Sequence, residues 1–495
     1  MTQVIPFFQV NPAYAETHWD HKGKIKPEHK VNVRELSHAS KKVKEMSIPL
    51  YRIHEKLKGK HLPHGMPQVL AEVTTGKSLS SGPSINGIGY DSVTPPDVQI
   101  AAGPSNIMEM VNLEGETWTT GGTPQGEPFD LASFFGTGTD FISDPKVMYD
   151  TNSGRWIASI TDASASSVVL AVSDSSDAAG SFCLYTVQGP SNTILDQPIT
   201  GTSNDKIVVS ANVFDSSTQQ FLHAQYWVLN KSEMVNCEPV DFVTSSSASY
   251  FSIHPVQSLT STTTQYMVST SQTQAGSYIN VFSIVGVPPG PVTSSATQLP
   301  VSSISTPPSA LQEGSFWQID TGDYRVQDAA WSNGTLWLAH NNSCTPAGDF
   351  IARSCLHLVE LDTNSMSVKQ DFDYGVAGKY LFYPALRELP DGNLVIVYGL
   401  SSLTDYPGIY VTGQAATDKP DSVEAPTVLQ AGQGPVTLFF GCLSVTGCRY
   451  GDYFGASLDP AQNDKVWVAG EYGSGALSYS GLGQTWATKI GSVTG

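Results

Sequence analysis

Seven residues hold one recurring position in the sequence, just before a stretch of alternating apolar residues, and their side chains suit several chemistries. They are Asp97, Asp144, Asp196, His254, Arg325, Tyr383 and Asp452. Carboxylates of this kind can ligate Ca²⁺, accept hydrogen bonds from sugar hydroxyls, or supply an acid and a base for glycoside hydrolysis or a lyase reaction. An aspartate at such a position also caps the turn into a strand, so a purely structural role remains open.

These residues belong to a strand–turn–strand unit that occurs seven times. The second strands of the copies centre near Ile107, Trp156, Ile207, Tyr266, Trp337, Val395 and Trp467. All copies but the first are followed by a further strand-like stretch, so that two hairpins would make a four-stranded sheet. Because one small sheet cannot bury both of its faces, such sheets pack radially around an axis.

The repeat therefore predicts an all-β fold, a seven-bladed β-propeller over residues 91–495. The residue before each first strand would then face the central tunnel, which would bring the seven chemical groups together. A two-sheet sandwich is the alternative fold, but it gives no reason for the repeat. Ring closure needs a strand from elsewhere, and residues 69–75 or 117–122 are the candidates.

Charge divides the chain into two parts. Residues 1–64 carry a net charge of +6, whereas residues 65–495 carry −25. The acidic body would repel phosphate backbones and anionic lipid, which disfavours nucleic acid as a partner and leaves cations and neutral glycans. No run of 18 apolar residues occurs, so no transmembrane segment is expected.

The part before the body has three predicted sections. Residues 1–15 end in an A-x-A triplet typical of the remnant of an export signal. Residues 16–64 form a basic arm with seven of the eleven histidines, which are His18, His21, His29, His38, His54, His61 and His64, and weak helical periodicity predicts helices over 31–46 and 48–57. Residues 65–90 are rich in Gly and Ser and are expected to be a linker.

Six cysteines, all in the acidic body, favour an oxidising compartment. Cys344 and Cys355 flank one short loop, Cys442 and Cys448 flank another, and the remaining two, Cys183 and Cys237, would form a longer link. Six unpaired buried thiols are the alternative. The localisation that we expect is extracellular or at the cell surface.

Several short motifs carry a resemblance to a known family. They include Pro95-Pro96-Asp97, Ser143-Asp144-Pro145, Gly154-Arg155-Trp156, Asp391-Gly392-Asn393 and Arg449-Tyr450-Gly451-Asp452-Tyr453. In them the chain resembles secreted sialidase-like (BNR-type) seven-bladed β-propeller proteins of bacteria and archaea, mostly of unknown function. The last motif adds Tyr453 to the predicted binding residues.

The chain departs from the sialidase pattern where that family does its chemistry. The best match to an Asp-box hairpin, residues 479–486, lacks both the Ser and the Asp and keeps only the turn and Trp486. Sialidases also need an arginine cluster for the substrate carboxylate. The body has five arginines, and no such triad can be assigned from their positions.

Two hypotheses of function follow. The first is an exported binding propeller without catalysis, whose partner is a glycan or cell-surface macromolecule and whose basic arm tethers it to an anionic envelope or partner. The second is a carbohydrate-active enzyme, a glycoside hydrolase or polysaccharide lyase, with Asp144, Asp196 and Asp452 as catalytic candidates. In either case the binding candidates are Asp97, His254, Arg325, Tyr383 and Tyr453. Neither hypothesis requires a cofactor, and the acidic ring would accommodate Ca²⁺.

Overall fold

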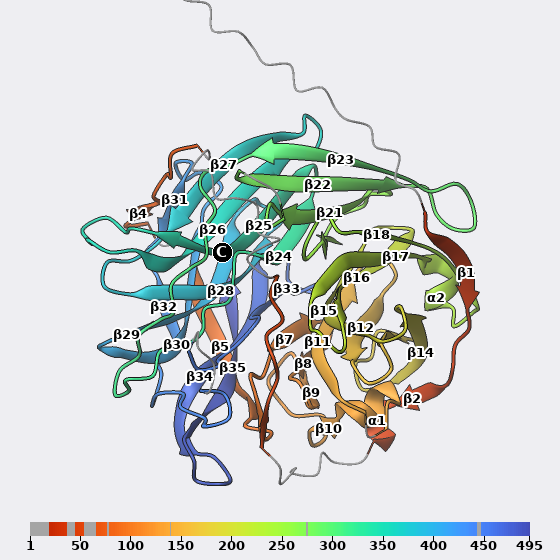
Figure 1. The fold of residues 1–495 in the computed structure, drawn as a ribbon, viewed down its shortest axis with the longest axis horizontal. Helices are drawn as coiled ribbons and strands as arrows, with labels where there is room; N and C mark the ends of the chain where they lie inside the picture. The colour runs from red at the N-terminus through yellow and green to blue at the C-terminus, as the bar shows by residue number, and fades with distance from the viewer. Residues whose placement is uncertain are drawn as a thin grey trace, which may run out of the picture.

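The chain folds into an all-β propeller (Figure 1). The computed structural model describes residues 19–36, 45–53, 66–76, 79–138, 140–273, 276–442 and 447–495. The predicted signal remnant and His18, His38, His54, His61 and His64 lie outside these residues. Helical structure in the described chain is confined to α1 (Leu131–Phe135), α2 (Lys231–Val235) and the 3₁₀ turn η1 (Val33–Glu35). Within the described ranges, no helix has the length and apolarity that a membrane crossing requires.

Five sheets form blades by themselves. The first contains β7 (Gln99–Ala102), β8 (Asn106–Met110), β9 (Glu114–Thr119) and β10 (Phe129–Asp130), and the second contains β11 (Ile142–Asp150), β12 (Arg155–Asp162), β13 (Ser167–Ser173) and β14 (Ser181–Gln188). The third sheet contains β19 (His254–Pro255), β21 (Gln265–Thr270), β22 (Tyr278–Val285) and β23 (Thr293–Pro300). The fourth contains β28 (Tyr380–Glu388), β29 (Leu394–Ser402), β30 (Asp405–Gln414) and β32 (Thr427–Gln430). The fifth contains β33 (Gly455–Leu458), β34 (Lys465–Leu477), β35 (Gln484–Thr494) and β5 (Ser80–Gly89).

A larger sheet of ten strands contains two more antiparallel runs of four. One run is β15 (Thr193–Thr202), β16 (Lys206–Asp215), β17 (Phe221–Asn230) and β18 (Val240–Ser247), and the other is β24 (Val326–Ser332), β25 (Thr335–Cys344), β26 (Arg353–Asp362) and β27 (Ser367–Tyr374). The short strand β20 (Gln257–Ser258) joins them by pairing in parallel with both β15 and β24. Counted as separate sheets, the blades therefore number five rather than the predicted seven.

The inner strands contact one another in a closed order. This order is β7, β11, β15, β19, β24, β28, β33 and back to β7. Between neighbouring blades lie the apolar cores, in which large aromatic side chains such as Trp156, Trp227 and Trp467 are buried. A two-sheet sandwich would not produce a closed order of inner strands, so the propeller prediction is confirmed at the level of the fold.

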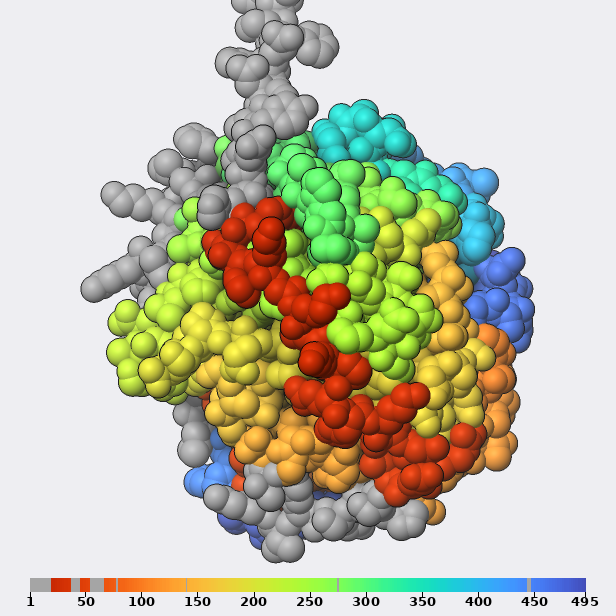
Figure 2. All heavy atoms as spheres, turned by 90° about the vertical axis from the view of Figure 1, so that its right-hand side faces the viewer, coloured from red at the N-terminus to blue at the C-terminus, as the bar shows by residue number. Residues whose placement is uncertain are grey.

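The N-terminal part adds strands to the outside of the propeller. β1 (His21–Ile25) extends the edge of β18, and β2 (Lys30–Asn32) extends the edge of β14. Figure 2 shows residues 19–36 as a band across the outer surface. Further along, β3 (Met46–Ser47) pairs with β6 (Val93–Thr94), and β4 (Glu72–Thr74) pairs with β31 (Ser422–Glu424).

The helices predicted for the arm are therefore wrong in its described part. Residues 31–36 form the end of β2 and η1, and residues 46–53 contain β3 and irregular chain. The apolar spacing was weak, and each outer blade edge offers a row of unpaired backbone N–H and C=O groups. An extended segment satisfies these groups, whereas a helix cannot.

The strand that closes the ring is β5. It pairs antiparallel with β35, the last strand of the chain, so that residues from both ends of the body share one sheet. Both predicted closing strands are wrong: residues 69–75 contain β4, and residues 117–122 lie in β9 and its following turn. Residues 79–90 are rich in Gly and Ser, which are typical of a linker and mask the alternating pattern of a strand.

Residues 69–71 dock on the edge of β27 next to a buried histidine. The N–H of Asp373 donates to the carbonyl of Val69 (2.8 Å), and the N–H of Ala71 donates to the carbonyl of Asp373 (2.9 Å). Behind this contact, His357 Nδ1 lies 3.0 Å from Asp373 Oδ1, and His357 Nε2 lies 2.9 Å from Asp371 Oδ1. Burial by itself would lower the pKa of His357, but the two carboxylates outweigh burial and raise this pKa to about 9.

We predict a pH dependence from this group. A pKa raised above the usual 6.5 means that folding is favoured by the proton. The contribution of His357 is therefore complete below about pH 6.5 and is lost as the pH rises through about 9, and its size is about 3 kcal/mol. Urea unfolding at several pH values should show a smaller fall over this window in His357→Gln than in the unsubstituted protein.

His223→Gln is the control for this experiment. Burial lowers the pKa of His223, so this residue affects the free energy of unfolding at acidic pH. His223→Gln should therefore leave the fall in this free energy between about pH 6.5 and pH 9 unchanged. If the free energy of unfolding falls equally over this pH window in His357→Gln and in the unsubstituted protein, His357 does not cause the pH dependence.

All six cysteines are paired, as two loop staples and one longer link. The disulfides are Cys183–Cys237, Cys344–Cys355 and Cys442–Cys448, with sequence separations of 54, 11 and 6 residues. The predicted pairing is confirmed, and the alternative of unpaired thiols is wrong.

We predict that the three disulfides stabilise the fold unequally. A disulfide restricts the unfolded chain more when its loop is longer, which gives about 4 kcal/mol for Cys183–Cys237 and about 2 kcal/mol for Cys442–Cys448. Double alanine substitution of each pair, followed by urea unfolding, should give free energies of unfolding in that order. The reverse order would show that local packing, not loop closure, dominates these contributions.

Candidate functional site at the propeller axis

Several residues just before the inner strands or within their first four residues have a left-handed backbone. Asp97, Asp144 and Tyr383 have φ values of 57°, 56° and 54°. Non-glycine residues adopt this conformation only at a cost, so neighbouring groups must hold it. In the next blade around the axis from Asp196, the equivalent residue is Ser252, with φ 49°.

Buried asparagines from the second strands hold these turns. Asn112 Oδ1 accepts the N–H of Asp144 (2.8 Å), while Asn112 Nδ2 donates to Asp97 Oδ2 (2.7 Å). Asn212 accepts the N–H of Ser252 (2.8 Å), and Asn341 accepts the N–H of Tyr383 (2.7 Å). Each asparagine therefore links the end of one blade to the start of the next.

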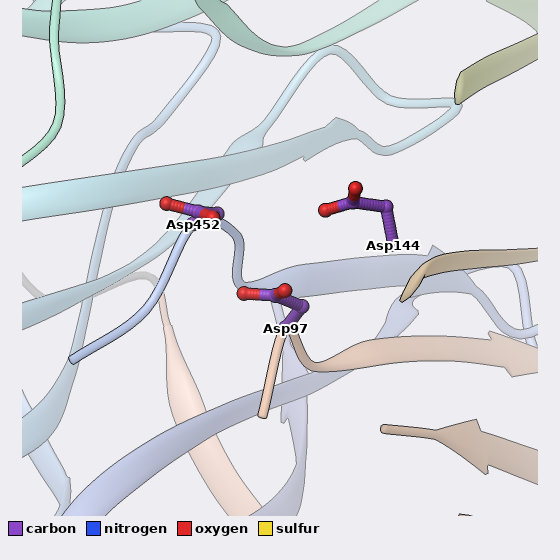
Figure 3. Close-up of side chains that lie close together, drawn as sticks. All are labelled: Asp97, Asp144 and Asp452. Carbon is purple, nitrogen blue, oxygen red and sulfur yellow. The ribbon is translucent and has the colours of Figure 1, made fainter. Parts of the chain in front are cut away.

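Three of the predicted acids meet at one point. Asp97, Asp144 and Asp452 each place a carboxylate oxygen within 4.8 Å of the oxygens of the other two. Figure 3 shows them gathered from three separate segments, with the carboxylate of Asp144 directed toward the other two. We call these three residues the acid cluster. The phenol of Tyr453 donates to Asp144 Oδ1 at 3.5 Å, so this predicted binding residue belongs to the same place.

Two arginines border the acid cluster. Arg449 Nη1 donates to Asp452 Oδ1 (2.8 Å), and Arg449 Nη2 donates to Asp452 Oδ2 (2.5 Å). Arg325 makes the corresponding pair with Asp323, with Nε 2.9 Å from Oδ1 and Nη2 2.8 Å from Oδ2. Arg325 Nη1 also lies 3.8 Å from Asp196 Oδ2, which places a further predicted acid beside the cluster.

Burial and mutual repulsion favour protonated forms of these acids. Burial, followed by the charges of Asp452 and Asp144, raises the pKa of Asp97 well above its usual range. The pKa of Asp144 and that of Asp196 are raised by burial in the same way. Conversely, burial lowers the pKa of Lys146 to about 7, although acids lie close to it. The environment therefore disfavours every isolated charge at the axis.

Residues 45–53 of the N-terminal arm cover this end of the axis, as their course up the middle of Figure 1 shows. Arg449 Nε donates to the carbonyl of Ile48 (3.2 Å), and Arg325 Nη2 donates to the carbonyl of Tyr51 (2.8 Å). Arg52 Nη2 in turn lies 2.5 Å from Asp320 Oδ1. The two arginines thus connect the buried acids below to the backbone of the covering segment above.

Not every predicted residue joins this group. His254 lines a narrow cavity of ≈40 Å³ further along the axis, together with Lys146, Asp328 and Arg387. There Arg387 Nη1 donates to Asp328 Oδ2 (2.6 Å), and burial lowers the pKa of His254 to about 4. Tyr383 is fully buried, and its phenol donates to the carbonyl of Asp320 (2.9 Å).

Sequence reasoning missed several residues of the site. They are Asn112, Lys146, Asp323, Arg449 and Glu471. Asn112, Asn212, Asn341 and Glu471 occupy the same place, near the end of the second strand of their repeats, and this recurrence of a polar residue in an apolar strand was visible in the sequence. Arg449 was noted only as part of a motif.

Comparisons with known proteins gave matches among solved structures, all at low sequence identity. No protein-family model matches the chain, and the search of curated proteins found no match. Among solved structures, the chain is similar to a phage phi92 endosialidase at 9% identity and a TM-score of 0.41, covering 84% of this chain and 69% of that one. It is also similar to a Penicillium chrysogenum alpha-L-arabinanase (8% identity, TM-score 0.36, covering 83% and 98%) and to a Trypanosoma rangeli sialidase (8%, 0.35, covering 83% and 60%).

We predict that Asn112 stabilises the site through its three hydrogen bonds, the third of which goes to the carbonyl of Pro95. Asn112→Ala leaves the N–H of Asp144 and an oxygen of Asp97 buried without their partner, which should lower the free energy of unfolding by about 2–4 kcal/mol in urea. The exposed Asn152→Ala is the control and should change this free energy by less than about 0.5 kcal/mol. Equal effects of the two substitutions would contradict the role of Asn112.

Proposed function

We propose that this protein is an exported seven-bladed β-propeller that binds a glycan or another cell-surface macromolecule without catalysing a reaction. Seven blades result when the ten-stranded sheet is divided at β20, and the closed order of inner strands supports this division. Three disulfides support an extracellular or cell-surface location, because such bonds persist in oxidising compartments.

A rim of exposed aromatic residues carries the proposal. Phe316 and Phe350 are 84% and 97% exposed, and Trp317, Phe439 and Phe440 are 40%, 51% and 45% exposed. Water does not favour such side chains on a surface, so their accumulation indicates a contact site. We call these five residues the aromatic rim.

The aromatic rim lies at the same end of the propeller as the acid cluster. Phe316 and Trp317 precede β24 in the segment that contains Arg325, and Phe439 and Phe440 precede β33 in the segment that contains Arg449. Phe350 follows β25, which runs antiparallel to β24 and therefore ends where β24 begins. The segment before β24, the loop after β25 and the segment before β33 thus place exposed aromatic side chains at one end of the propeller.

Hydrogen bonds and disulfides hold the rim segments together. Gln312 Nε2 donates to the carbonyl of Val436 (3.0 Å), and the N–H of Val436 donates to Gln312 Oε1 (2.8 Å). The disulfide Cys442–Cys448 follows Phe440, and Cys344–Cys355 flanks Phe350. A preorganised aromatic surface suits the stacking of sugar rings, since little conformational entropy is lost on binding.

The acids of the axis fit a binding protein better than an enzyme. A pair of carboxyl groups that hydrolyses a glycosidic bond must reach the substrate. Here Asp97 is 0% exposed and Asp144 is 3% exposed, and residues 45–53 lie over both. Asp452 is occupied by Arg449 on both of its oxygens.

A glycoside hydrolase or polysaccharide lyase is the second candidate function. One observation favours it: burial raises the pKa of Asp97 and that of Asp144 beside a third carboxyl group, as a general acid requires. This function would need residues 45–53 to leave the axis, so that substrate could reach Asp144, Asp196 and Asp452.

We predict that the aromatic rim binds polysaccharide. On a panel of polysaccharides, the double substitution Phe316→Ala with Trp317→Ala should weaken binding of the preferred ligand at least about tenfold, because both rings lose their stacking area. Val285→Ala is the control: Val285 is 51% exposed at the end of β22, away from the rim, and its loss should leave binding unchanged.

The same panel is assayed for release of reducing ends. Binding without release supports the proposal. Release that Asp144→Asn abolishes would instead establish the second candidate, and binding that is unaffected by loss of both rim aromatics would show that the rim is not the site.

A further inference from the structure

We propose that the acid cluster of Asp97, Asp144 and Asp452 binds a calcium ion. Ca²⁺ takes oxygen ligands at about 2.3–2.6 Å, so oxygens on opposite sides of the ion lie about 4.6–5.2 Å apart. The cluster places one oxygen from each of three carboxylates within 4.8 Å of one another, which matches a shared ion of this size. The inference stands on these contacts and is independent of the proposed glycan binding.

Buried oxygens without partners surround the cluster. Among the described residues, no donor satisfies Asp97 Oδ1, Asp196 Oδ2 or either carboxylate oxygen of Glu471. Asp97 and Glu471 are fully buried, so water does not compensate for the missing hydrogen bonds. An unsatisfied buried carboxylate is costly, and a cation is the partner that several of them can share.

Glu471 faces the cluster from the last blade. Its Oε1 lies so close to the Cα of Gly451 that a Cβ there would be 1.9 Å away, and Gly451 directly precedes Asp452. Burial, followed by the charges of Asp97 and Asp452, raises the pKa of Glu471 well above its usual range. After burial, the charge of Asp144 is the strongest influence on the carboxyl group of Asp196. Asp196 and Glu471 therefore lie next to the acid cluster but outside the group of three whose oxygens lie within 4.8 Å of one another.

The protein's own cations do not balance this charge. Seven carboxyl groups gather here, those of Asp97, Asp144, Asp196, Asp320, Asp323, Asp452 and Glu471, against the four cations Arg52, Lys146, Arg325 and Arg449. Arg449 pairs with Asp452 and Arg325 with Asp323, and both arginines also donate to carbonyls of the covering segment. Lys146 Nζ lies 3.1 Å from the centre of the Tyr453 ring, and within the described chain it has no carboxylate oxygen within 4.0 Å.

The donor set favours Ca²⁺ over other metals. All candidate ligands are oxygens, and His254, the nearest predicted imidazole candidate, lies in the cavity further along the axis. Hard oxygen ligands select Ca²⁺ or Mg²⁺, and Mg²⁺ requires shorter bonds and near-octahedral geometry. An ion here would join β11 to the segments before β7 and β33, which is where the first and last blades meet.

Calcium titration of the full-length, metal-depleted protein tests the proposal. We expect one Ca²⁺ to bind per chain by isothermal titration calorimetry, and the melting temperature to rise by several degrees in Ca²⁺ relative to EGTA. Asp97→Asn should abolish both effects. Asp328→Asn is the matched control, because Asp328 is a largely buried axial acid that pairs with Arg387 outside the cluster, and it should keep the calcium response.

Terbium luminescence covers the case in which Asp97→Asn fails to fold. Tb³⁺ replaces Ca²⁺ at oxygen sites, and Tyr453 beside Asp144 would sensitise its emission in the unsubstituted protein. Emission that Ca²⁺ displaces and that Tyr453→Phe strongly reduces supports the site. Absence of calcium binding to the unsubstituted protein, or unchanged calcium affinity in folded Asp97→Asn, would overturn it.

Discussion

The burial of several carboxyl groups around one axis is the constraint on which the rest of the structure depends. Asp97, Asp144 and Asp452 lie near the starts of three inner strands, so groups hundreds of residues apart in the sequence meet at the acid cluster. Like charges in such a place repel one another and lose hydration, which would open the ring. Arg449, Arg325 and Asn112 oppose this by bonding the acids directly.

The N-terminal arm completes what the blades leave unsatisfied. A propeller protects its strand edges only partly, and the arm extends the outer edges of β18 and β14 with β1 and β2. At the axis the arm's backbone carbonyls accept hydrogen bonds from both arginines. The arm is thus a part of the fold, although its composition, basic and rich in histidine, suggested a separate tether.

The repeat could be predicted from the sequence because its signal was local. Each unit alternates apolar and polar residues around a turn, and from that pattern the propeller and the convergence of Asp97, Asp144 and Asp452 followed. Long-range pairing could not be predicted in the same way. The closing strand β5 depends on its match with β35, about 400 residues away, and Gly and Ser in it indicated a linker.

The separation of His254 from the other predicted residues has a geometric reason. Its repeat begins with Ser252 in the left-handed conformation, so the residue that turns toward the cluster comes two positions earlier, and His254 lies within β19 and faces the cavity. In the preceding repeat Gln197, next to Asp196, has the left-handed backbone. A shift of one or two residues in register therefore decides which side chain reaches the acids, and the sequence pattern does not resolve shifts of this size.

With the proposed function, the arrangement separates stability from recognition within one face of the propeller. At the axis, Arg325 and Arg449 bond both to buried acids and to the covering arm, and a ligand could reach these acids only by displacing the hydrogen bonds of the two arginines to the arm. At the rim, aromatic side chains are exposed on loops that disulfides and backbone contacts hold in place. Loops can vary without disturbing the ring, whereas a change at the axis alters the balance of charge among three blades. Selection for a new ligand would therefore act first on the rim.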